Sequence, residues 1–159
     1  MNVTKIVPAK PYEVQLDRVK RWKDEIERKL EDINRGNYKG DKAIFFDMIF
    51  AFFVFCYHIK DYIENDNSLL VTKVTLNEFI KNNYCLRICY DLCIGTKHLV
   101  INHPKTTGGT LRININYKLN RVGNKVIVSL QSKTVNQEFS DLADECIQKW
   151  EEFIKTEVS

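Results

Sequence analysis

The sequence is short of residues that break or cross-link a chain: it has 3 prolines, 6 glycines and 5 cysteines among 159 residues. The odd number of cysteines and the absence of a CxxC pair argue against a disulfide framework. The opening residues, MNVTKIVPAK, contain no apolar segment of the secretory type, so we expect free thiols in the reducing cytoplasm. The motifs GxGxxG, GxxxxGK[S/T], HExxH and GxSxG are also missing, which removes four common enzyme signatures.

Long hydrophobic runs are also scarce, with one exception at residues 43–62, AIFFDMIFAFFVFCYHIKDY, which hold six of the nine phenylalanines. Its uninterrupted apolar part is only residues 48–57, whereas a membrane span needs roughly 20 apolar residues. We therefore expect the buried central helix of a bundle and no membrane partner. Asp47 interrupts the run, and we expect it to be a buried or half-buried carboxylate paired with a base from another helix.

The spacing of apolar residues changes along the chain from helical to alternating and back. It predicts helices at 12–34, 42–64 and 75–94, strands at 98–103, 110–118 and 125–132, and a last helix at 136–156. Whether Asn82 and Asn83 break the third helix is left open. The fold class predicted is α+β in one domain, residues 1–159: an antiparallel bundle of about four helices with a three-stranded antiparallel meander before the C-terminal helix.

Acidic residues are absent from residues 95–135, which contain seven lysines and arginines, while residues 137–159 hold seven acids against two lysines. In one interpretation, the basic meander and the acidic last helix compensate each other or are simply solvated. In the other, a wet face of the meander binds RNA or DNA phosphates. The residues proposed for that face are Arg112, Lys118, Arg121 and Lys125. The net charge of +3 is too small to decide between them.

The apolar run ends in a polar segment that is the candidate catalytic site. His58 and Asp61 are three residues apart and share a helix face. The third helix supplies a second set, and the hypothetical cluster comprises His58, Asp61, Arg87, Asp91, Lys97 and His98. Such groups suit general acid–base catalysis on a phosphodiester. The structural alternative is that His58 bridges two helices and that Asp91 pairs with Arg87 or Lys97.

Three cysteines, Cys85, Cys89 and Cys93, form a stripe at every fourth residue. The outer two would lie roughly 12 Å apart along a helix axis, too far to share one zinc ion. A pair of them with His58 could reach one ion, but small buried core residues explain the stripe better. We therefore expect no metal and no cofactor.

Residues 41–98 resemble the HEPN type of helical bundle. The segments FCYHIKDYI and YDLCIGTKH within them resemble signature segments of a bacterial family, with no function attached. The resemblance to HEPN bundles implies a small, often dimeric bacterial domain of the toxin–antitoxin and anti-phage kind, many of which are metal-independent ribonucleases. The usual mark of those enzymes, an arginine followed four to six residues later by a histidine, is not reproduced. Arg87 and His98 are eleven residues apart, and neither Arg112 nor Arg121 precedes a histidine.

The abundance of Lys, Ile and Asn suggests a bacterial protein, and we expect it in the cytoplasm. The sequence is compatible with three functions. The first is association, as a homodimer through the central or the last helix or with another partner. The second is a HEPN-like ribonuclease that uses a cluster of His58, Asp91 and His98. The third is nucleic-acid binding through the basic meander.

Overall fold

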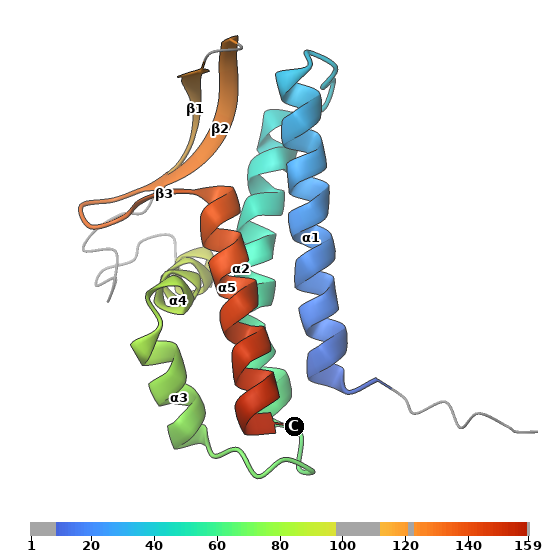
Figure 1. Ribbon diagram of the computed structural model, residues 1–159, viewed down its shortest axis with the longest axis vertical. Helices are drawn as coiled ribbons and strands as arrows, with labels where there is room; N and C mark the ends of the chain where they lie inside the picture. The colour runs from blue at the N-terminus through green and yellow to red at the C-terminus, as the bar shows by residue number, and fades with distance from the viewer. Residues whose placement is uncertain (1–8, 98–111, 121–122, 159) are drawn as a thin grey trace, which may run out of the picture.

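The computed structural model describes residues 9–97, 112–120 and 123–158 (Figure 1). The helices are α1 (Pro11–Asn34), α2 (Lys42–Glu64), α3 (Lys73–Asn82), α4 (Tyr84–Lys97) and α5 (Phe139–Phe153). A single π-helical turn, Ile154–Val158, continues α5. The strands are β1 (Arg112–Asn120), β2 (Gly123–Gln131) and β3 (Asn136–Glu138). The predicted α+β fold, a helical bundle with a three-stranded antiparallel sheet before the last helix, is confirmed.

Helices α1, α2 and α5 lie side by side, with α1 antiparallel to the other two (Figure 1). Helix α2 begins at Asp41, whose carboxylate accepts a hydrogen bond from the Ala43 amide at 2.8 Å, as expected of an N-cap. The rings of Phe52, Phe53 and Phe139 meet edge to face, with centroids 5.1 to 5.9 Å apart. This aromatic contact joins α2 to α5 at the centre of the core.

Helix α2 is buried on one side only. Phe45, Ile49, Phe52 and Ile59 are fully buried, whereas Ile44 is 58% exposed. Asp47 is exposed, which corrects the expectation of a buried carboxylate. The apolar segment Ala43–Glu64 is long and apolar enough to cross a membrane by length and composition, a test that core helices also pass.

The third predicted helix is two helices that meet at Asn83. Asn83 has an extended backbone, with φ −109° and ψ 112°, so the chain turns there and α4 starts in a new direction. Helix α3 begins at Lys73 because the Thr72 side chain caps the amide of Thr75. Helix α4 then packs against α2 and α5. This arrangement brings the C-terminal half of α4 to the end of α2.

The sheet has the strand order β1–β2–β3, with both pairs antiparallel. Val126, Val128 and Leu130 are buried, so one face of β2 packs on the helices, as the alternation predicts. The short strand β3 lies where the sequence pattern predicts the start of the last helix. The predicted strand at 98–103 lies outside the described residues.

One side chain fastens the sheet to the bundle. The Asn34 amide, at the end of α1, donates to the Val126 carbonyl at 3.1 Å and accepts from the Val126 amide at 2.5 Å. Strand β3 pairs with residues 129–131 of β2 and does not reach Val126. The Asn34 side chain satisfies the backbone groups of Val126 in place of a neighbouring strand.

Candidate functional site

His58 and Asp61 form a hydrogen-bonded pair on the last turns of α2. Nδ1 of His58 lies 2.5 Å from Oδ2 of Asp61, and their side chains are 32% and 41% exposed. A carboxylate can only accept a hydrogen bond, so Nδ1 carries the proton. In the neutral imidazole, Nε2 is then left with its lone pair, which is the state of a general base.

Helix α4 places a thiol on the other side of the ring. Sγ of Cys93 is 3.7 Å from Nε2 of His58, and Cys93 is fully buried. The carboxylate, imidazole and thiol thus stand in the order found in nucleophilic triads. A thiol without exposed surface cannot contact a substrate, so Cys93 holds the ring rather than attacks.

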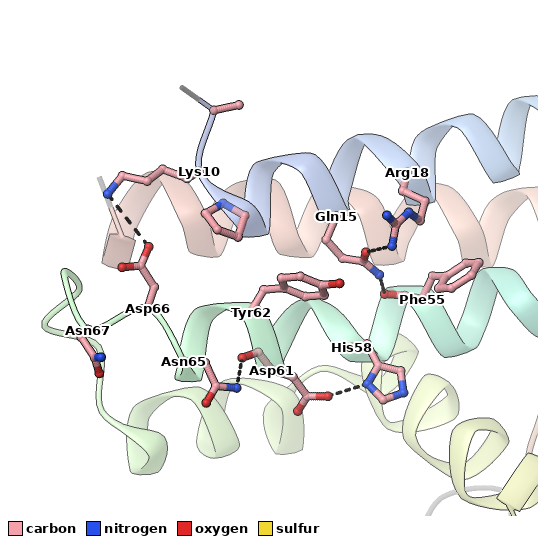
Figure 2. Close-up of a pocket in the computed structure, with 12 residues that line it drawn as sticks. Lys10, Gln15, Arg18, Phe55, His58, Asp61, Tyr62, Asn65, Asp66 and Asn67 are labelled. Atoms are coloured by element: carbon pink, nitrogen blue, oxygen red, sulfur yellow. Dashed lines mark hydrogen bonds and ion pairs between the residues drawn. The ribbon is translucent and has the colours of Figure 1, made fainter. Parts of the chain in front are cut away.

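A cleft of about 960 Å³ opens between the start of α1 and the end of α2, and both His58 and Asp61 line it (Figure 2). Phe55 and Tyr62 give it aromatic walls, and Asn65 and Asn67 add amides. The remaining lining residues are Ala9, Lys10, Pro11, Gln15, Arg18 and Asp66. The cleft therefore offers planar apolar surface beside charged and hydrogen-bonding groups, as a nucleotide requires.

The position of Arg18 in this cleft is fixed by Gln15, which is buried in α1. Gln15 Nε2 donates to the Phe55 carbonyl at 2.9 Å, and Gln15 Oε1 accepts from the Arg18 guanidinium at 2.8 Å (Figure 2). The guanidinium also lies over the Phe55 ring, 5.7 Å from its centroid. Within the described ranges, no carboxylate is close enough to Arg18 for an ion pair. Arg18 is therefore available to an anionic ligand.

Lys10, by contrast, is already engaged at the other end of the cleft. Its ammonium donates to the Ser68 hydroxyl at 2.9 Å and lies 4.0 Å from the Asp66 carboxylate. Asp66 in turn accepts from the Ser68 amide and hydroxyl, and these bonds lower the pKa of the Asp66 carboxyl. The charges at this end are balanced, so Arg18 is the cation that distinguishes the cleft.

The predicted catalytic cluster also includes Arg87, Asp91, Lys97 and His98. Arg87 donates to the Lys81 carbonyl and lies over the Tyr84 ring, at the junction of α3 and α4. Asp91 is buried in α4, only 2% exposed. Lys97 is the last residue of α4, and His98 lies outside the described residues. The structure thus joins His58 to Asp61 as predicted and directs Arg87 to the α3–α4 junction.

The proposed nucleic-acid face is described only in part. Arg112 on β1 and Lys125 on β2 are exposed. Lys118 is the register partner of Lys125 across the β1–β2 pair, so the two backbones bring these positions together. Arg121 lies outside the described residues.

Two residues of this site were not predicted as such. Arg18 is one of many charges on the solvated side of α1, and nothing in its local pattern distinguishes it. In the sequence, Cys93 is distinguished only as the last member of the stripe Cys85, Cys89 and Cys93. That stripe is divided in the structure: Cys93 contacts His58, whereas Cys89 faces Cys56 and Cys146 in the core.

Comparison with protein-family models, with curated proteins and with solved structures found no match to this chain.

Proposed function

We propose that this protein is a metal-independent ribonuclease in which His58 is the proton acceptor. The observation that carries the proposal is the hydrogen-bonded His58–Asp61 pair in the wall of a cleft that is also lined by Arg18, which has no ion pair among the described residues. A basic imidazole beside a fixed cation is what cleavage of RNA by its own 2′-hydroxyl needs.

In the proposed reaction, Nε2 of His58 takes the proton of a ribose 2′-hydroxyl. The 2′-oxygen attacks the adjacent phosphorus, the bond from phosphorus to the 5′-oxygen breaks, and the leaving oxygen takes a proton from water. The products are a 2′,3′-cyclic phosphate and a 5′-hydroxyl. Nε2 is 3.7 Å from the Cys93 thiol, so the 2′-hydroxyl has to displace this contact to reach it.

The neighbouring groups have separate roles in this reaction. Asp61 fixes the ring and stabilises the imidazolium as it forms. Arg18 stabilises the charge that develops on the phosphorane oxygens. Tyr62, an exposed aromatic side chain in the cleft, offers a surface on which a base stacks, a contact that tolerates any base. We therefore expect cleavage of single-stranded RNA with weak sequence preference.

The test is cleavage of a fluorescent single-stranded RNA by the purified chain in EDTA, with the product ends identified by mass spectrometry. We expect cyclic-phosphate ends and a loss of about 100-fold or more on Arg18→Ala, as is common for electrostatic groups. Arg28→Ala is the matched control, because Arg28 lies on the same helix but pairs with Glu25 and Asp32. Equal activity of the two variants would contradict the role of Arg18.

Self-association is a second candidate, favoured by exposed apolar side chains near the start of α3. Leu70 is 99% exposed and Val74 67%. Such residues are often covered by a second copy of the chain. If they are, Leu70→Glu converts a dimer into a monomer in light scattering at micromolar concentration. Asn77→Glu, an exposed position on α3, leaves the dimer intact. A wild-type chain that is monomeric at every concentration refutes this candidate.

A further inference from the structure

Three thiols from three different helices meet in the core. Cys56 of α2, Cys89 of α4 and Cys146 of α5 are fully buried, and their sulfurs all lie within 4.8 Å of one another. The sulfurs of Cys89 and Cys146 are 3.5 Å apart. Cys85, one turn before Cys89, is also fully buried, and its thiol lies against that of Cys146. Four sulfur donors are thus concentrated where an ordinary core would have aliphatic side chains.

A buried indole points to a charged partner at this place. Trp150 is fully buried, and its Nε1 has no hydrogen-bond partner among the described groups. A buried donor without an acceptor destabilises the fold, so such a group needs an explanation. The indole lies beside Cys56 and, on α5, one helical turn after Cys146. A metal-bound thiolate is an acceptor that would satisfy it.

We propose that Cys56, Cys89 and Cys146 bind one zinc ion in the core, with Cys85 as the nearest fourth donor. Zinc bound at about 2.3 Å to each sulfur places tetrahedral ligand sulfurs about 3.8 Å apart. The observed separations therefore require only small side-chain rotations. Each thiol that ionises releases one proton to solvent as zinc binds, and no redox step is involved.

The ion would have a structural role, because it would tie α2, α4 and α5 together and none of its three cysteine ligands lines the cleft. The three ligands come from three different helices, so the distance along one helix axis that keeps Cys85, Cys89 and Cys93 from sharing one ion does not apply to them. The proposal is also independent of the ribonuclease proposal, which uses neither Cys56 nor Cys146. Either one can fail without the other.

The first experiment measures zinc by mass spectrometry in the untagged full-length chain, expressed in zinc-supplemented medium and purified under reducing conditions. We expect about one equivalent in the wild type and in Cys93→Ser, and loss of zinc in Cys56→Ser and Cys146→Ser. Only variants with the wild-type circular dichroism spectrum are compared. A wild-type chain without zinc, or a disulfide between Cys89 and Cys146 in its place, overturns the proposal.

The second experiment needs no variant, so a folding failure cannot obscure it. The wild-type chain is unfolded, stripped of metal with a chelator and refolded with cobalt(II) alone. We expect the intense thiolate-to-cobalt charge-transfer absorption and the visible bands of a tetrahedral site, saturating at one cobalt per chain. Refolding to the native spectrum with no such absorption overturns the proposal.

Discussion

The replacement Asp61→Asn tests whether the His58–Asp61 pair acts as a unit. The amide keeps the size of the side chain but removes the charge that faces the imidazole across 2.5 Å. With the charges of an imidazolium and a carboxylate centred about 4 Å apart, their Coulomb energy is about 4 kcal/mol at an effective dielectric of 20 and about 1 kcal/mol in water. Because the Asp61 side chain is 41% exposed, we take the lower part of that range, about 1–2 kcal/mol.

If proton transfer to His58 limits the reaction, this loss lowers kcat/KM for RNA about five- to thirty-fold. The assay is the initial rate of cleavage of a fluorescent RNA in EDTA at substrate concentrations below KM. Asp66→Asn is the matched control: it removes an equal charge from the same cleft, so it reports the general effect of charge on RNA affinity. We expect less than a three-fold change for it.

Two outcomes would refute the reasoning. An Asp61→Asn variant with the wild-type rate would show that the pair does not support proton transfer. Equal gains in affinity for the Asp61→Asn and Asp66→Asn variants, with kcat unchanged, would show that Asp61 is only a repulsive charge near the RNA.

Further predictions concern the sheet. Asn34→Ala leaves the amide and carbonyl of the buried Val126 without their partner and lowers the free energy of unfolding in urea by about 2–3 kcal/mol. Asn114→Ala, which removes one exposed hydrogen bond on β1, changes it by at most about 0.5 kcal/mol, and equal losses would contradict the role of Asn34. Arg112→Ala and Lys125→Ala each reduce the slope of log affinity for RNA against log salt by about 1, and an unchanged slope would exclude the meander as a binding face.

The sequence predicted those parts of the fold that depend on local pattern. Asp41 and the apolar run define α2, and the alternation of Val126, Val128 and Leu130 defines β2. Strand β3 was missed because three residues, Asn136–Glu138, are too few to show a period. Asp47 was misjudged because periodicity reveals that a helix is apolar, not which side its neighbours leave open.

The candidate site could be predicted only where it is local. His58 and Asp61 are three residues apart on one helix, so their pairing follows from helical geometry. The contact with Cys93 depends on the turn at Asn83, which sets the direction of α4. Arg18 enters the site through Gln15 and the Phe55 carbonyl, a contact between two helices that no single segment encodes.

The most direct test of the central claim is chemical rescue of His58→Ala. We expect this variant to cleave RNA at least about 100-fold more slowly than the wild type in EDTA, since general-base catalysis contributes that much or more. Imidazole added to the buffer should restore part of the rate, with the same cyclic-phosphate ends. A His58→Ala variant that cleaves at the wild-type rate, or a wild-type chain that cleaves no RNA, would contradict the account.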